Sequence, residues 1–154
     1  MADLKGLFER LGFSGVQTYL QSGNVVFSGS ASSNGHAGMI EKAIHEDFGH
    51  EVSVFVFQKS GFLKVAESNP LLEEDGVDVG CLHVTFLHEA IAAREIPLQE
   101  GEMAVLSLGH YFLYCPNGYG RTKITNSYFE RVLKQSVTTR NWKTVQALKR
   151  MLEE

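Results

Sequence analysis

The chain has 154 residues and a formal net charge of −4, and 44% of its residues are hydrophobic. This composition excludes a disordered chain and is typical of a folded globular protein. No apolar run approaches the roughly 18 residues of a membrane-spanning helix, and the first residues do not form a secretory signal. We therefore expect a cytoplasmic protein that does not enter membranes. Its two cysteines, Cys81 and Cys115, are too few for a disulfide framework.

The charges are unevenly distributed along the chain. Residues 1–106 carry 15 acidic and 6 basic side chains, whereas residues 107–152 carry 8 basic side chains and one acidic one. A basic segment on an acidic protein can concentrate anions locally. The alternative, which the sequence leaves open, is that the two segments attract each other.

In the first half of the chain, the spacing of apolar residues predicts a helix, a hairpin, a second helix, a strand and a short helix. These elements cover residues 2–12, 16–27, 39–49, 52–57 and 60–68. The run 52–57 is apolar at nearly every position, which is typical of a central strand. Residues 28–38 are expected to form a polar loop.

In the second half, a predicted linker over residues 71–80 leads into a strand, a helix, two strands and two helices. They cover residues 81–87, 89–95, 102–115, 127–135 and 141–152, with the turn between the paired strands near Leu108-Gly109. The β-α-β-β-α-β order is the ferredoxin-like pattern. The second half gives β-α-β-β-α, and the first half gives the same order except that its opening strand is missing.

This near repeat predicts an α+β fold made of two ferredoxin-like (split β-α-β) subdomains. The first would occupy residues 1–70, truncated at its N-terminus. The second, with the basic C-terminal helices, would occupy residues 81–154 after the linker at 71–80.

The segment YCPNGYGRTKITN, residues 114–126, carries the first candidate site. It is not a Walker loop, because the position five residues before Gly120 is Cys115 rather than glycine. The following Ser127 and Glu130 have the spacing of a capping box, with Thr125 and Asn126 as alternative caps. A helix that begins beside basic side chains favours an anion.

A second basic segment repeats this arrangement, with Thr138 or Thr139 as the cap of the last helix. If the two helix starts converge, they frame a phosphate or carboxylate. The candidate anion-binding residues are Arg121, Lys123, Asn126, Thr139, Arg140, Asn141 and Lys143. The alternative interpretation, also open, is ordinary caps and a loop held by salt bridges.

Other kinds of site have less support. Tyrosines and Trp142 lie among the basic residues and could stack single-stranded bases, but their spacing favours burial, and the sequence lacks an RNA-recognition signature. The six histidines are scattered without metal-ligand spacing, and neither cysteine has an activating neighbour. We therefore expect no metal and no cofactor, and catalytic residues stay unknown.

Several segments resemble a bacterial family known as domain of unknown function 1697. They are residues 11–27, 69–70, 82–87, 114–130 and 138–145, of which YCPNGYGRTKITNSYFE and TTRNWKTV are the most specific. The resemblance implies paired ferredoxin-like subdomains and no known activity. Family members usually begin with a strand and an R-G-I-N-V-G-G loop that this sequence lacks. We expect an N-terminally shortened form, with a vacant sheet position through which two copies could dimerise.

Taken together, these patterns predict a cytoplasmic binding module for a phosphate-bearing small ligand. Two alternatives stay open. One is an enzyme that acts on a phosphorylated or nucleotide substrate, and the other is a structural or interaction protein, or a binder of single-stranded nucleic acid.

Overall fold

The structure is a computed structural model of an α+β protein with two antiparallel sheets, which confirms the predicted fold class. It describes residues 2–19, 23–29 and 35–154. The contacts within the chain define two compact units. The first unit comprises residues 1–59 and 148–154, and the second unit comprises residues 60–147. The predicted linker at 71–80 lies inside the second unit.

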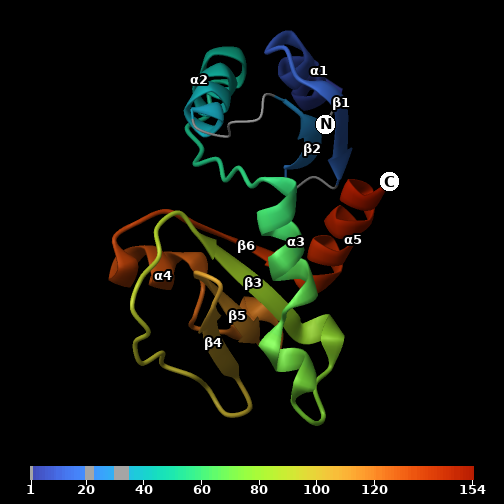
Figure 1. Cartoon of the computed structure of the whole chain (residues 1–154). Helices are drawn as coiled ribbons and strands as arrows, with labels where there is room; N and C mark the ends of the chain where they lie inside the picture. The colour runs from blue at the N-terminus through green and yellow to red at the C-terminus, as the bar shows by residue number, and fades with distance from the viewer. Residues whose placement is uncertain (1, 20–22, 30–34) are drawn as a thin grey trace. The chain divides into compact units, whose positions relative to one another are not determined.

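The described part of the first unit contains two whole helices, the end of another helix and a two-stranded sheet (Figure 1). These are α1 (Ala2–Arg10), β1 (Ser14–Tyr19), β2 (Asn24–Ser28) and α2 (His36–Phe48). Strands β1 and β2 pair antiparallel, as the predicted hairpin requires, and part of its turn lies outside the described residues. The predicted loop at 28–38 is also partly outside them, and its last residues belong to α2.

Aliphatic and aromatic side chains form the core of the first unit. Leu7 and Phe8 of α1 and Ile40 of α2 pack with Phe13 and Val16 from the start of the hairpin. An ion pair between Arg10 and Asp47 joins the ends of α1 and α2 at the surface. Leu4, Leu7 and Phe8 have the i, i+3, i+4 spacing of a helical stripe, so α1 presents one apolar face to this core.

The predicted central strand at 52–57 is wrong, since residues 51–58 carry no strand assignment. Val54 and Val56 are only half-buried and pack against the core of the first unit. The amide of Val54 donates to Glu41 Oε2 of α2 at 2.8 Å, and so is satisfied by a side chain rather than by a strand. The apolar sequence reflects the packing of these valines against the core, and such packing does not require that the segment pair with another strand.

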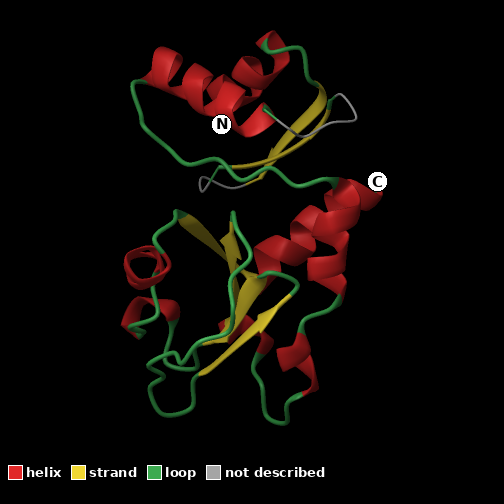
Figure 2. Cartoon of the chain, turned by 60° about the vertical axis from the view of Figure 1, so that its left-hand side comes forward, coloured by secondary structure: helices red, strands yellow, loops and turns green. Residues whose placement is uncertain are grey.

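The second unit is built on a four-stranded antiparallel sheet (Figures 1 and 2). Its strands are β3 (Leu82–Leu87), β4 (Met103–Ser107), β5 (His110–Tyr114) and β6 (Val137–Asn141), in the spatial order β4-β5-β3-β6. The predicted pair of strands around Leu108-Gly109 is confirmed as β4 and β5. Strand β6 was not predicted, although Val137 and two threonines have the β-branched side chains that favour strands.

Helices and short 3-10 turns precede, connect and follow these strands. The helices are α3 (Lys59–Glu67), α4 (Asn126–Leu133) and α5 (Trp142–Glu153), and the 3-10 turns are η1 (Pro70–Glu73), η2 (Val79–Cys81) and η3 (Tyr119–Arg121). The first residues of α5 belong to the second unit and its last residues to the first. Trp142, the predicted core residue of α5, is buried. None of the helices in the described residues is both long and apolar enough to cross a membrane.

The helix predicted at 89–95 is wrong, because residues 90–99 have no regular structure. Hydrogen bonds to Val132 at the end of α4 and to Gln135 just beyond it hold this loop instead. Gln135 accepts from the amides of His88 and Glu89 and donates to the carbonyl of Glu89, while Arg94 donates to the carbonyl of Val132 at 3.0 Å. Because a loop stands in place of this helix, the ferredoxin-like arrangement of the two subdomains stays a prediction.

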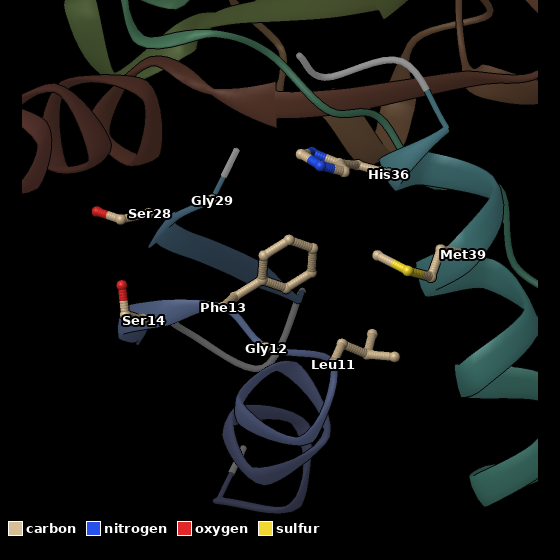
Figure 3. A pocket seen from close by; sticks show the side chains of 8 residues that line it. All are labelled: Leu11, Gly12, Phe13, Ser14, Ser28, Gly29, His36 and Met39. Carbon is tan, nitrogen blue, oxygen red and sulfur yellow. The ribbon is translucent and has the colours of Figure 1, made fainter. Parts of the chain in front are cut away.

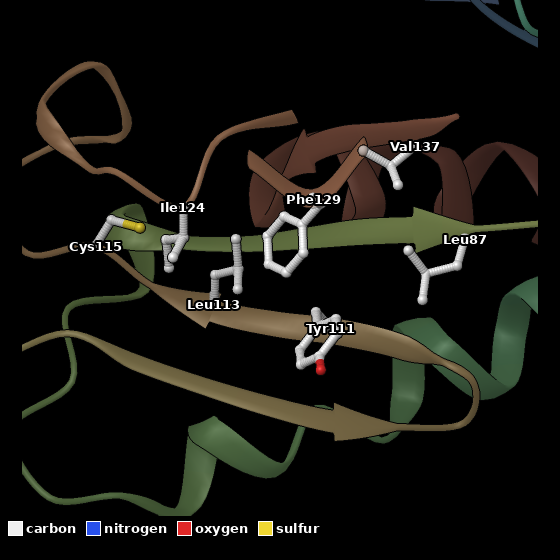
Figure 4. Close-up of a cluster of buried hydrophobic side chains, with 7 residues drawn as sticks. All are labelled: Leu87, Tyr111, Leu113, Cys115, Ile124, Phe129 and Val137. Carbon is white, nitrogen blue, oxygen red and sulfur yellow. The ribbon is translucent and has the colours of Figure 1, made fainter. Parts of the chain in front are cut away.

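Each face of the sheet in the second unit carries apolar side chains. Figure 4 shows the face beneath α4, where Phe129 packs among residues of three strands and the preceding loop. Its ring lies 5.0 Å from that of Tyr111, measured between centroids. On the other face, Phe62 of α3 stacks on Phe86 of β3 with centroids 6.0 Å apart. Strand β3 is therefore buried from both sides.

We predict that Phe129→Ala lowers the free energy of unfolding by about 3–5 kcal/mol, because it leaves a cavity between α4 and the sheet. Tyr128→Ala, on the neighbouring and half-exposed position, should cost clearly less. Urea unfolding of both variants measures the difference. Equal losses would contradict the assignment of Phe129 to the core.

Candidate functional site

The polar residues at one end of the sheet in the second unit form the candidate site. Strand β6 runs antiparallel beside β3, and their register places Thr139 opposite Thr85 and Asn141 opposite His83. Because side chains alternate along a strand, these four point to the same face, the one that α4 covers. Helix α4 begins at Asn126, beside Thr139.

A chain of hydrogen bonds crosses this face. The hydroxyl oxygen Oγ1 of Thr139 lies 2.6 Å from Asn126 Oδ1 and 2.8 Å from Thr85 Oγ1. Since the amide oxygen of Asn126 can only accept, Thr139 donates to it, and Thr85, which is fully buried, donates to Thr139. These bonds fix the first residue of α4 to the centre of the sheet.

Tyr119 of η3 adds a second contact to the same place. Its hydroxyl donates to Asn126 Oδ1 at 3.4 Å, and its ring packs on the imidazole of His83 with centroids 4.9 Å apart. Atom Nδ1 of His83 is buried and has no hydrogen-bond partner among the described residues. Burial lowers the pKa of His83 below its ordinary value, and the carbonyl of Cys81 acts in the opposite direction with a smaller effect.

The two basic residues of the preceding turn lie on the surface. Arg121 ends η3, and Lys123 follows two residues later, and both are exposed. Neither forms an ion pair with a residue in the described part of the chain. The alternative interpretation expected salt bridges to hold this loop, and none is found at these two positions.

The start of α4 differs from the predicted capping box. Thr125 is the N-cap residue, and its side chain makes no hydrogen bond to the first turn. Glu130 does not reach back either, because its Oε2 accepts from the amide of Val137 at 3.1 Å and so fixes the start of β6. The first amides of α4 are consequently left without a side-chain cap.

The start of α5 also differs from the prediction. Thr138 and Thr139 lie within β6 and do not cap this helix. Asn141 takes that role, since its Oδ1 accepts from the amide of Thr144 at 3.1 Å. Lys143, in the first turn of α5, is exposed.

Arg140 lies on the face of the sheet opposite to Thr139. Its Nη1 donates to Thr138 Oγ1 at 2.7 Å and to the carbonyl of Thr139 at 3.0 Å. Burial lowers the pKa of this guanidinium. Of the seven candidate residues, the structure thus joins Asn126 and Thr139 directly, places Asn141 on their face and turns Arg140 away from it.

Sequence reasoning did not single out His83, Thr85 or Tyr119 as partners of Asn126. The available signal was the alternation in residues 81–87, which places His83 and Thr85 on one face of a strand. Their pairing with Thr139 depended on β6, which was not predicted.

The cysteines offer no activated nucleophile. Both thiols are free, and burial raises the pKa of each, that of Cys115 to about 11. The negative charges of Asp78 and Glu102 add to the increase at Cys81 and Cys115, respectively. Among the described residues, no three His, Cys, Asp or Glu side chains gather closely enough to hold a metal ion.

The aromatic residues of β5 do not form an open stacking platform. Tyr111, Phe112 and Tyr114 are buried, as is Trp142. Tyr119 and Tyr128 remain half-exposed, and Arg131 lies over the ring of Tyr128 at 5.5 Å from its centroid.

We predict that Thr139→Val destabilises the protein by about 1–3 kcal/mol, because Thr85 loses its acceptor in a fully buried position. Thr138→Val serves as the control, since Arg140 keeps the carbonyl of Thr139 as a second acceptor. Chemical denaturation compares the two variants. A smaller loss of free energy of unfolding in Thr139→Val than in Thr138→Val would show that the hydrogen-bond chain contributes little to stability.

We also predict that stability falls as pH drops below about 6.5, the ordinary pKa of histidine. Burial lowers the pKa of His83 and of His110, so the unfolded chain binds protons that the folded chain does not. The contribution of these two histidines to the free energy of unfolding is fully present above pH 6.5, and it is lost as the pH falls from 6.5 to their lowered pKa values. Urea unfolding between pH 5 and 8 measures it. His83→Gln should reduce the change of the free energy of unfolding with pH, whereas His45→Gln, at an exposed position, provides the control.

Comparison with known proteins places the chain in a family. The sequence model of a family described as "Protein of unknown function (DUF1697)" matches residues 1–105. A search of curated proteins gives no match. Among solved structures, the chain is similar to the conserved bacterial protein SP0830 from Streptococcus pneumoniae, with 21% sequence identity and a TM-score of 0.73. That similarity covers 99% of this chain and 88% of the other, and it shows a shared fold. The chain belongs to the DUF1697 family.

Proposed function

We propose that the protein is a cytoplasmic binding module for a phosphate-bearing small ligand, which binds at the start of α4. Two features at the same place carry the proposal. Arg121 and Lys123 are exposed and have no ion-pair partner among the described residues, and the helix start beside them lacks a side-chain cap. Free amides at a helix N-terminus and nearby cations both stabilise a negative charge.

The hydrogen-bond chain supports the same interpretation because it fixes the geometry of the helix start. Asn126 Oδ1 is occupied by Thr139 and Tyr119, which leaves the amide nitrogen of Asn126 as the donor available to a ligand. A helix start held in place before binding loses little conformational freedom when the ligand arrives. Asn141 and Lys143, at the start of α5, extend the proposed site.

The experiment is a calorimetric titration of the full chain with inorganic phosphate, pyrophosphate, adenosine monophosphate and a short single-stranded DNA. Arg121→Ala and Lys123→Ala should each weaken binding about 5- to 30-fold, the equivalent of about 1–2 kcal/mol for a lost charge-assisted hydrogen bond. Lys64→Ala removes another exposed lysine of the second unit and is the matched control.

Each outcome separates the alternatives. Loss of binding in Lys64→Ala as large as in Lys123→Ala would indicate general attraction between charges and contradict a defined site. Tighter binding of the single strand than of every small anion would favour the nucleic-acid alternative. Conversion of pyrophosphate or adenosine monophosphate during the titration would favour the enzyme alternative.

A further inference from the structure

The two cysteines of the chain lie opposite each other on neighbouring strands. The register of β3 and β5 pairs Leu82 with Tyr114, so the next residues outward are Cys81 and Cys115. The amide of Cys115 donates to the carbonyl of Cys81 at 3.0 Å, which extends the pairing by one position. Residues that are opposite in an antiparallel pair share a face of the sheet. Figure 4 shows Cys115 on the face beneath α4.

The separation of the two backbones suits a disulfide. Opposite residues joined by a ladder hydrogen bond have Cα atoms about 5.5 Å apart, and disulfides span Cα separations of about 4.4–6.8 Å. The ladder is incomplete at this pair, because the amide of Cys81 donates to the carbonyl of Asp78 at 2.9 Å. Cys81 Sγ lies 3.9 Å from the carbonyl oxygen of Pro116, the residue that follows Cys115. The Cys81 sulfur thus lies beside the neighbouring strand.

The two thiols differ in their access to solvent. Cys81 is partly exposed at the end of η2, whereas Cys115 is fully buried. A reagent in solution can therefore reach Cys81 first, and Cys115 can react only with a group that Cys81 already carries. A sulfur that is open to solvent beside a second, resolving cysteine is the arrangement of redox-sensitive pairs.

The surroundings of the thiols favour a bridge once it has formed. Burial raises the pKa of both thiols, and the carboxylates of Asp78 and Glu102 add to this increase at Cys81 and Cys115, respectively. A lowered pKa would stabilise the reduced form as thiolates and make the bridge easy to reduce. Here both pKa values are shifted the other way, so the pair reacts slowly at neutral pH and its bridge resists reduction.

We propose that Cys81 and Cys115 form a redox site, in which a small disulfide oxidises the two thiols to a bridge between β3 and β5. The thiolate of Cys81 attacks one sulfur of the reagent, forms a mixed disulfide and releases one thiol. The thiolate of Cys115 then attacks Cys81 Sγ, closes the bridge and releases the second thiol. The protein loses two hydrogen atoms, and the reagent is reduced to two thiols. The proposal does not depend on anion binding.

The test is incubation of the reduced full chain with oxidised glutathione at about pH 8.5, the ordinary pKa of a thiol, followed by alkylation and mass spectrometry. A disulfide is preferred to peroxide, because Met39 is exposed beside a pocket of the first unit (Figure 3) and peroxide would oxidise its thioether. Trypsin separates the two cysteines into residues 65–94 and 95–121. We expect these peptides to be joined within one chain, with no glutathione attached.

Single variants establish the order of the two steps. Cys115→Ala should keep one glutathione on Cys81, because no second thiol displaces it. Cys81→Ala should stay unmodified, because Cys115 is fully buried. The proposal is overturned if the parent stays reduced, keeps glutathione on Cys81 or joins the peptides only between two chains. Modification of Cys81→Ala as fast as of the parent would also overturn it.

A second measurement uses the parent alone and so does not depend on the variants folding. The chain is equilibrated with mixtures of reduced and oxidised glutathione, once in buffer and once in urea. Because the fold holds the cysteines opposite each other, half-reduction of the bridge should require a ratio of [GSH]² to [GSSG] at least about tenfold higher in buffer than in urea. An equal or lower ratio in buffer would show that the folded strands strain the bridge, and would contradict the proposal.

Discussion

The pairing of β3 with strands on both of its sides is the constraint on which the second unit depends. Strand β5 lies on one side and β6 on the other, both antiparallel, and side chains pack on both faces of β3. A register shift of one residue in β6 would move Thr139 and Asn141 to the other face. The position of α4, and with it the proposed anion site, therefore follows from the register of two short strands.

The elements that depend on local patterns could be predicted from the sequence. Helix α1 shows this, since its apolar stripe and the glycine after it are contained within a dozen residues. The segments 52–57 and 89–95 could not be predicted in this way. In both, hydrogen bonds to residues distant in sequence decide the structure. The amide of Val54 donates to the Glu41 side chain in the first case. In the second, the Gln135 side chain accepts from the amides of His88 and Glu89, and Arg94 itself donates to the carbonyl of Val132.

The candidate site shows the same division. Asn126, Thr139 and Asn141 could be selected from the sequence because asparagine and threonine begin helices, and Asn141 does cap α5. The bond between Asn126 and Thr139 could not, because it arises from sheet register rather than from helix capping. Arg140 fails to join them for the same reason, since neighbouring residues of a strand point to opposite faces.

Both ends of α4 are held by side chains from other elements, which has a consequence for its dynamics. An eight-residue helix is marginal by itself, because the cost of forming its first turn is spread over few hydrogen bonds. Here Thr139 and Tyr119 hold its first residue, Arg94 bonds to a carbonyl of its last turn, and Gln135 ties the residues just beyond it to the loop after β3. The helix and this loop should therefore open and close as one cooperative segment. An anion bound at the helix start would slow that opening, and so protect from hydrogen exchange a loop that it does not touch.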